Sequence, residues 1–230
     1  AMLKCGFGGI NKARWDKKET RLFVEPHIEQ GRVLETKKVP IGIVTGIAAP
    51  ARHIVTVEGR TDHSGGTPMN MRLDAMAAAA EMTITAEKIG KEAFSAGKAT
   101  VVTVGNLVVH QGSINKVPGK AKIYIEIRDI SLKDRDDAEK KILGEFKEIA
   151  KKRGVEVKFE ETERGNPATM HKSTSDLLTK ACGKLNIKWM PIVSGPSQDS
   201  RHLANYGIPT GMIFVPSKNG ISHSQKSTPK

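Results

Sequence analysis

The order of predicted strands and helices between residues 51 and 163 constrains the fold of this chain more than any other feature of the sequence. Residues 52–60 alternate polar and apolar side chains and contain several β-branched residues, which predicts a strand. Residues 69–90 are rich in Ala, Met and Glu, which predicts a helix. Thr67 and Pro68 are expected to form the N-cap and first turn of that helix.

Two more strands, a helix and a final strand follow in the same region. Residues 99–109 and 120–128 predict strands, and the second strand carries its apolar side chains on one face: Ala121, Ile123, Ile125 and Ile127. Residues 134–153 have apolar side chains at near-helical spacing, which predicts an amphipathic helix ending at Gly154. Residues 155–161 predict the last strand. The resulting order, β-α-β-β-α-β, is typical of a ferredoxin-like fold.

The segments on either side predict a mixed α/β domain. A chain of 230 residues with 38% hydrophobic residues can bury a real core in one large domain or two small ones. We therefore expect residues 1–50 and 164–230 to form one discontinuous α/β domain, interrupted by the ferredoxin-like domain at residues 51–163. The elements expected in it are strands at 21–28, 41–49, 187–193 and 208–215, and helices at 173–185 and 199–206.

The chain is strongly basic, with a formal charge of +12 and a pI near 9.7. This balance raises the expectation of nucleic acid or anionic ligands. However, the lysines of residues 133–152 alternate with acidic residues, which is typical of a solvated helix face. Tyr124 is the one aromatic residue of the two central predicted strands, whereas RNA-binding sheets need several aromatic residues for stacking. Nucleic acid is therefore disfavoured as a partner.

Cysteine content and hydropathy place further limits on the class of protein. Cys5 and Cys182 give no disulfide framework. No apolar run reaches the length of a transmembrane helix, and no signal-peptide pattern opens the chain. We therefore expect a cytoplasmic protein that does not bind a membrane.

Residues 23–31, FVEPHIEQG, place a histidine between two glutamates near the end of a short apolar strand. Neutral imidazole binds zinc or manganese well, so His27 is a candidate metal ligand. A histidine at the rim of a hydrophobic core gives the same pattern, and both interpretations stay open on this segment alone.

Three residues of the ferredoxin-like region are candidates for binding or catalysis. His63 lies in a glycine-rich loop before a helix, where backbone N–H groups favour an anion or an oxyanion. Asn115 lies in a turn whose composition is also ordinary for a hairpin. Arg128 can bind a carboxylate through two parallel hydrogen bonds, or it can pair with Glu126 or Asp129.

Two loops near the end of the chain follow predicted strands, where ligand-binding groups are common. One contains His223, in Gly-Ile-Ser-His-Ser, and the other spans residues 194–200 and offers backbone donors to a substrate. The sequence contains no Gly-x-Gly-x-x-Gly, P-loop, Cys-x-x-Cys or Gly-x-Ser-x-Gly motif. A nucleotide-binding loop and a serine-hydrolase elbow are therefore unsupported.

Taken together, these segments resemble the M20 family of metal-dependent amidohydrolases. The resemblance is to the branch of N-carbamoyl-L-amino-acid hydrolase, β-ureidopropionase and allantoate amidohydrolase. The matching segments occur in family order: His27 to Gly31, His63 to Met69, Arg72 to Ala75, Ile114 to Gly119, Ile127 to Arg128, Pro209 to Ser217 and Gly220 to Ser224.

The resemblance implies an α/β zinc-hydrolase domain interrupted by a ferredoxin-like lid, through which two chains form a homodimer. It implies two divalent metal ions, zinc or manganese, whose bridging water attacks an amide or ureido carbon of a small substrate with a carboxylate. By position, His27 and His223 match metal ligands, and His63 matches a catalytic residue that stabilises the oxyanion, commonly in the partner's site. The positions that match substrate-binding residues are Gln30, Asn115 and Arg128.

The chain also departs from the family pattern. No histidine is followed two residues later by aspartate, so the His-x-Asp motif is missing, and so is the Glu-Glu pair that supplies the general base. Glu160 and Glu161 fall at the end of the lid, where we expect them to be solvated. Gln198 stands where the family has a histidine in the substrate pocket, so it is also a candidate substrate-binding residue.

Because zinc needs three or more protein ligands, we expect partial or no metal occupancy and little or no hydrolysis by this chain alone. The first hypothesis is a truncated amidohydrolase portion, which works with a separate N-terminal half if one exists. A second hypothesis is a non-catalytic dimeric binding or assembly module derived from the family. A third is nucleic-acid binding driven by charge, which a salt-dependent shift with random DNA or RNA tests.

Overall fold

A computed structural model of the chain describes residues 2–6 and 16–222, which divide between two compact units. Unit 1 comprises Ala1–Gly46, Thr169–Ser194 and Gln198–Lys230. Unit 2 comprises Ile47–Ala168 together with Gly195–Ser197.

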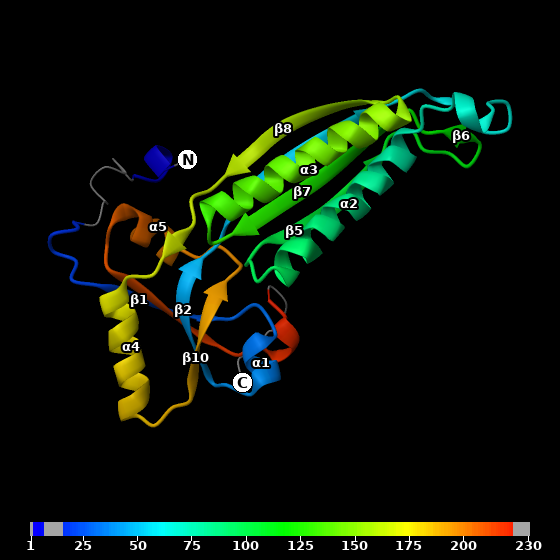
Figure 1. The fold of residues 1–230 in the computed structure, drawn as a ribbon. Coiled ribbons are helices and arrows are strands. Elements are labelled where there is room, and N and C mark those ends of the chain that lie inside the picture. The colour runs from blue at the N-terminus through cyan, green and yellow to red at the C-terminus, as the bar shows by residue number, and fades with distance from the viewer. Residues whose placement is uncertain (1, 7–15, 223–230) are drawn as a thin grey trace. The chain divides into compact units, whose positions relative to one another are not determined.

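Unit 2 is built on an antiparallel sheet of four strands in the order β5-β7-β3-β8. Two long helices, α2 and α3, run along this sheet (Figure 1). The chain order is β-α-β-β-α-β, as predicted from the sequence. The bounds are β3 Ala49–Glu58, α2 Ala75–Ser95, β5 Val101–Val109, β7 Lys120–Asp129, α3 Leu132–Arg153 and β8 Glu156–Arg164.

The core of unit 2 lies between the sheet and the two helices. The apolar residues predicted for one face of β7, Ala121, Ile123, Ile125 and Ile127, are all buried there. Small side chains on α2 let that helix approach the strands closely, and larger ones on α3, such as Ile142 and Phe146, fill the remaining space. Burying each of these larger apolar side chains stabilises the unit by roughly 1.5–3 kcal/mol.

The start of α2 differs from the prediction. The helix begins at Ala75, and its N-cap is Asp74, whose Oδ1 accepts a hydrogen bond from the backbone N–H of Ala77 at 3.0 Å. Pro68 has an extended backbone conformation and precedes a short 3-10 turn, Met69–Met71, so Thr67 is not the N-cap. The carboxylate of Asp74, three residues before the N–H that it accepts, therefore sets where α2 begins. This cap outweighs the helix-favouring composition from which the earlier start was predicted. The predicted end of α3 at Gly154 is confirmed, since that residue is left-handed with φ 68°.

A buried polar network joins α3 to the sheet of unit 2. His53 on β3 lies 2.5 Å from Glu139 on α3, and both side chains are more than nine-tenths buried. Arg164 at the end of β8 donates to Glu139 at 2.5 Å and to Glu161 at 2.6 Å. Glu160 and Glu161 are both exposed, as expected from the sequence. The half-exposed guanidinium of Arg164 thus compensates the buried carboxylate of Glu139.

The sheet face without helices carries charged side chains in cross-strand rows. Glu58 on β3 accepts hydrogen bonds from Lys120 on β7 at 2.8 Å and from Lys158 on β8 at 2.6 Å. These two hydrogen bonds and the charges behind them lower the pKa of Glu58 to about 2. Glu58 lies directly opposite Glu156 on β8, so the two lysines also offset the repulsion between these carboxylates.

Unit 1 contains a sheet in the order β1-β11-β2-β10, with the short strand β9 beside β2. Strands β1 and β11 are parallel, while β11 and β2 are antiparallel. Helix α4 covers part of the sheet through Leu178 and Cys182, which pack on Ile43. The bounds of the strands are β1 Phe23–Ile28, β2 Ile41–Ile47, β9 Ala168–Thr169, β10 Trp189–Ser194 and β11 Thr210–Val215.

The helices of unit 1 are α1 Val33–Lys37, α4 Lys172–Lys184 and α5 Ser200–Tyr206, with 3-10 turns at Met2–Cys5 and Lys218–Gly220. Helix α1 was not predicted. The start of α4 lies so close to β11 that a Cβ atom at Gly211 would come within 2.5 Å of the Thr174 side chain. Over residues 2–6 and 16–222, we find no helix long and apolar enough to cross a membrane.

Replacing Glu139 by Ala should destabilise unit 2 by about 3 kcal/mol, because the substitution leaves His53 and Arg164 without their shared acceptor. Urea denaturation followed by circular dichroism measures this change. Glu148, exposed on the same helix, offers the control. An equal loss of stability for Glu139→Ala and Glu148→Ala would contradict a stabilising role of the network.

Glu58 should make stability depend on pH. Its folded pKa of about 2 lies below its ordinary value of 4.5, so its contribution is present above pH 4.5 and is lost as the pH falls toward 2. Wild type should therefore exceed Glu58→Gln in stability at pH 7, and the difference should shrink in that acidic window. A difference in urea midpoint that stays constant from pH 7 to pH 3 would show that the carboxylate contributes nothing through ionisation.

Candidate functional site

The residues predicted from the sequence to form a site fall into both units. His27, Gln30 and Gln198 belong to unit 1, while His63, Asn115 and Arg128 belong to unit 2. His223, predicted as a metal ligand, lies outside the described residues.

His27 is oriented by its own strand end. It lies opposite Phe214 in the parallel register of β1 and β11, and the two rings pack at 6.4 Å between centroids. Nδ1 of His27 lies 2.8 Å from the carbonyl oxygen of Ile28. A carbonyl can only accept, so Nδ1 carries a proton, and in the neutral ring Nε2 keeps its lone pair. This is the arrangement in which a histidine can bind a metal ion through Nε2.

The two glutamates that flank His27 already hold other groups. Both carboxylate oxygens of the buried Glu29 accept backbone N–H groups at the start of α1, from Val33 at 2.7 Å and Leu34 at 2.8 Å. Glu25 accepts the backbone N–H of Ser200 at 2.9 Å and its hydroxyl at 2.5 Å. These carboxylates stabilise helix starts, so neither is free to act as a base in this conformation.

Gln30 and Gln198, both predicted substrate-binding residues, are in contact although 168 residues separate them. Nε2 of Gln198 donates to Oε1 of Gln30 at 3.3 Å, and the hydroxyl of Ser194 donates to Oε1 of Gln198 at 2.6 Å. Gln30 has a left-handed backbone with φ 57°, a conformation that is costly for a residue with a side chain. Three chain segments thus bring a small polar cluster together at the end of β1.

In unit 2, a two-stranded sheet brings His63 and Asn115 together. Strand β4, Asp62–His63, pairs with β6, Lys116–Val117, and places His63 opposite Lys116. The backbone N–H of Ser64 then donates to the carbonyl of Asn115 at 3.0 Å. These strands lie at one end of the unit, beyond the end of the long sheet (Figure 1).

The glycine-rich loop fixes the tautomer of His63. The backbone N–H groups of Gly65 and Gly66 both donate to Nδ1 of His63, each at 3.1 Å. Nδ1 must therefore be the acceptor, and in the neutral ring the proton lies on Nε2. The side chain is exposed, so its N–H donor is available to a ligand.

Arg72 holds this loop in shape, and the sequence alone gave it no role. Its Nε donates to the carbonyl of Thr67 at 3.0 Å, and its Nη2 donates to the carbonyl of Ser64 at 2.5 Å. The guanidinium therefore closes the turn that carries His63. The sequence placed Arg72 inside the predicted helix of residues 69–90, and its partners are backbone carbonyls that no side-chain pattern marks.

Arg128 pairs with Glu126, one of the alternatives that the sequence left open. Its Nε and Nη2 bind the two carboxylate oxygens of Glu126 at 2.5 and 2.9 Å, while its Nη1 donates to the carbonyl of Gly195 at 3.0 Å. Pairing with Asp129 is excluded because that buried carboxylate accepts from Thr100 at 2.6 Å and from the backbone of Ser131 at 2.8 Å.

The long sheet separates Arg128 from the pair of His63 and Asn115. On β7, Arg128 lies opposite Pro50, and Lys120, eight residues earlier, lies opposite Glu58 at the other end of β3. Eight strand residues span about 26 Å. His63 and Asn115 lie beyond the Lys120 end, so one small molecule cannot touch them and Arg128 of the same unit.

Within the described part of the chain, one group of three potential metal ligands has its atoms within 4.8 Å of one another: His53, Glu139 and Glu161. These residues were not predicted as ligands. The guanidinium of Arg164 already binds both carboxylates, so a divalent cation would have to displace a permanent positive charge. The chemistry of this cluster fits a structural ion network better than a metal site.

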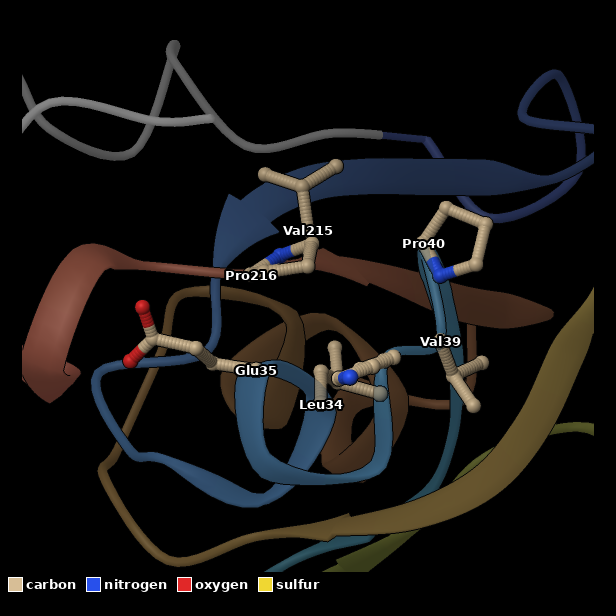
Figure 2. A pocket seen from close by; sticks show the side chains of 7 residues that line it. Leu34, Glu35, Val39, Pro40, Val215 and Pro216 are labelled. Atoms are coloured by element: carbon tan, nitrogen blue, oxygen red, sulfur yellow. The ribbon is translucent and has the colours of Figure 1, made fainter.

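A hollow of about 370 Å³ in unit 1 lies beside α1 and the end of β11 (Figure 2). Its lining is mostly apolar: Leu34, Val39, Pro40, Val215 and Pro216, with Glu35 and Lys38. Glu35 points away from Val39 and Pro40 and accepts the backbone N–H of Asn219 at 2.8 Å (Figure 2). Of the predicted site residues that the structure describes, none lines this hollow.

Arg201 is a feature of unit 1 that the sequence did not reveal. It lies one helical turn after Gln198 and is 8% exposed. Its Nε and Nη1 are buried and have no hydrogen-bond partner among the residues that the structure describes. Two buried N–H groups without acceptors are costly, so we expect a neutral side chain of similar length to be favoured at this position.

Comparison with known proteins assigns the chain to a family. The model of peptidase family M20/M25/M40 matches residues 2–228, so the chain belongs to the M20 family. Members of this family generally use divalent metal ions. The resemblance inferred from the sequence motifs is thereby confirmed.

Similar proteins include an N-carbamoyl-L-amino acid amidohydrolase of Geobacillus stearothermophilus, 40% identical over 89% of this chain and 49% of the relative. A ureidoglycolate hydrolase of Oryza sativa subsp. japonica is 41% identical over 87% of this chain and 41% of the relative. A crystal structure of a hydantoinase/carbamoylase family amidase from Burkholderia phymatum superposes with a TM-score of 0.84 at 30% identity, covering 97% of this chain and 55% of that one. The chain therefore spans about half the length of such relatives, and its predicted α/β fold is confirmed.

Replacing Arg201 by Met should raise the free energy of unfolding by about 1–2 kcal/mol, because a side chain of similar length removes two buried N–H groups that find no acceptor within residues 2–6 and 16–222. Chemical denaturation of unit 1, with Arg21→Met as the control for an exposed arginine, measures the effect. A loss of stability for Arg201→Met would show that the guanidinium makes a favourable interaction in solution.

Proposed function

We propose that this chain is the substrate-binding part of an amidohydrolase that cleaves the carbamoyl or ureido C–N bond of small acids. The proposal is supported by relatives named as N-carbamoyl-L-amino acid amidohydrolase and ureidoglycolate hydrolase. The observation that carries it is the fixed Nε2–H tautomer of the exposed His63, next to Asn115.

A donor of this kind suits hydrolysis of a ureido group. Attack of water on the ureido carbon places negative charge on its oxygen, and an oriented N–H donor stabilises that charge. The backbone of the glycine loop fixes the ring of His63 before the ligand arrives, so little reorganisation is needed. The amide of Asn115 lies on the adjoining turn and offers a second polar contact.

Arg128 is proposed to bind the carboxylate of the substrate, and the length of the sheet then requires two chains. His63 and Asn115 of one chain would act on a substrate held by Arg128 of its partner, because about 26 Å separates these groups within one unit. The active assembly is therefore proposed to be a homodimer formed through unit 2. A monomer by light scattering at high concentration would contradict this assembly.

When bound, the divalent ions would supply an activated water, and His27 would hold one of them through Nε2. Zinc needs three or more protein ligands, and the carboxylates flanking His27 are engaged by backbone N–H groups and by Ser200. We therefore expect this chain alone to hydrolyse poorly and to need ligands from another polypeptide segment. Carboxylate binding without turnover would favour the second candidate, a binding or assembly module.

Arg128 should be required for binding of the carboxylate. Titration calorimetry should detect binding of N-carbamoyl-L-alanine but not of its amide, and Arg128→Met should weaken this binding at least about tenfold. Arg21→Met, which removes an exposed positive charge from unit 1, should leave the affinity unchanged.

Ammonia release from N-carbamoyl-L-amino acids, with added manganese or zinc, tests the catalytic part of the proposal. We expect little release from this chain alone. Fast, chelator-sensitive release would show that the chain carries a complete set of ligands and a base. Equal binding of the acid and its amide would contradict recognition of a carboxylate.

A further inference from the structure

Glu126 binds the guanidinium of Arg128 along one whole edge, and we propose that Glu126 is the positioning residue for carboxylate recognition. Its two oxygens accept Nε of Arg128 at 2.5 Å and Nη2 at 2.9 Å. This parallel pair fixes both the plane and the rotation of the guanidinium. The inference rests on the proposed role of Arg128 in binding the substrate's carboxylate.

The sheet itself creates this arrangement. Glu126 and Arg128 are two residues apart on β7, so both side chains project from the face that the helices do not cover. Arg52 on β3 lies directly opposite Glu126, and Glu163 on β8 lies directly opposite Arg52. Arg52 donates to Glu126 at 2.5 Å and also to Glu163, so the row alternates in charge across three strands.

Glu126 and Arg128 are less exposed than Arg52 and Glu163. The side chains of Arg128 and Glu126 are 18% and 27% exposed, whereas those of Arg52 and Glu163 are 43% and 42% exposed. Burial raises the pKa of Glu126, but the hydrogen bonds from Arg128 and Arg52 outweigh burial and hold that pKa below its usual value. Glu126 therefore remains a carboxylate at neutral pH and keeps its two hydrogen bonds to Arg128.

Arg52 balances part of the charge of Glu126. Because Arg52 also pairs with Glu163, the four side chains carry two positive and two negative charges, and Arg128 can attract an anion through the N–H groups directed away from Glu126 and not through an excess of positive charge. The edge of Arg128 that faces away from Glu126 carries Nη1, which donates to the carbonyl of Gly195 at 3.0 Å and lies 3.4 Å from the hydroxyl of Ser197. A ligand carboxylate bound at this edge would take the place of the Gly195 carbonyl and the Ser197 hydroxyl, so a charged acceptor would replace two neutral ones.

The substitution Glu126→Gln separates positioning from charge. If Glu126 only reduced the positive charge near Arg128, its removal would tighten binding of N-carbamoyl-L-alanine. If Glu126 positions Arg128, binding should weaken about tenfold, because the amide offers a single acceptor where the carboxylate offered two. Affinity equal to or tighter than that of wild type would overturn the inference.

Glu160→Gln is the matched control. Glu160 is exposed on β8 and lies opposite Ile54, so its substitution removes the same charge from the same sheet without touching Arg128. This variant should bind N-carbamoyl-L-alanine as tightly as wild type. If both variants bound N-carbamoyl-L-alanine equally weakly, the cause would be the loss of negative charge from the sheet and not the loss of the hydrogen bonds between Glu126 and Arg128.

The hydrogen exchange rate of the Arg128 Nε–H, followed by ¹⁵N NMR, gives a readout that needs no ligand. Exchange should be slow in wild type and at least about tenfold faster in Glu126→Gln, since this N–H loses its charged acceptor. Arg52→Met keeps the contact of Glu126 with Arg128 and should keep slow exchange. If the Arg128 Nε–H exchanged as fast in Arg52→Met as in Glu126→Gln, the inference that Glu126 fixes the guanidinium of Arg128 would be overturned.

The two measurements distinguish failure of the inference from failure of the proposed function. If wild type does not bind N-carbamoyl-L-alanine while its Nε–H exchanges slowly, the proposed substrate class is wrong and the hold on Arg128 stands. If wild type binds this acid and the exchange rate is unaffected by Glu126→Gln, the positioning role is wrong and the substrate class stands.

Discussion

The alternation of side chains along β7 is the constraint on which the rest of unit 2 depends. Burial of Ala121, Ile123, Ile125 and Ile127 under the helices commits every second residue to the opposite face. That face receives Lys122, Tyr124, Glu126 and Arg128, so the same pattern that forms the core also places the residues of the candidate site. A shift of one residue in register would bury the charged residues and expose the isoleucines, which ties the position of Arg128 to the stability of the sheet.

Much of this fold follows from local sequence patterns, and its exceptions have a common cause. The order of strands and helices in unit 2 and the end of α3 at Gly154 are predictable because periodicity and a left-handed glycine act over short distances. The start of α2 was predicted wrongly, and α1 was missed. A single carboxylate sets the start of each helix: Asp74 for α2 and Glu29 for α1. Their hydrogen bonds to backbone N–H groups cannot be read from the amino-acid composition.

The candidate site was less accessible to sequence reasoning, because its residues meet through contacts far apart in the chain. The family motifs singled out Gln30 and Gln198. Their contact, however, depends on how the end of β1 and the turn before α5 lie next to each other in the folded unit. The sequence offered Glu126 as one of two partners for Arg128, and the choice follows from burial. Asp129 faces the interior and is saturated there, while Glu126 shares the open face with Arg128.

The length of the sheet then determines how the proposed chemistry can be shared. A strand of ten residues separates its two ends by several times the size of a ureido acid, so the groups at those ends cannot act on one ligand unless two chains combine. Such a division places different demands on the two ends. In the proposed dimer the turn of His63 has to keep its shape while it approaches another molecule, and the glycine N–H groups and the hydrogen bonds of Arg72 meet this demand. If Arg128 binds the substrate as proposed, it has to keep its orientation while it exchanges acceptors, and a carboxylate held between two guanidiniums meets that demand without involving the ligand.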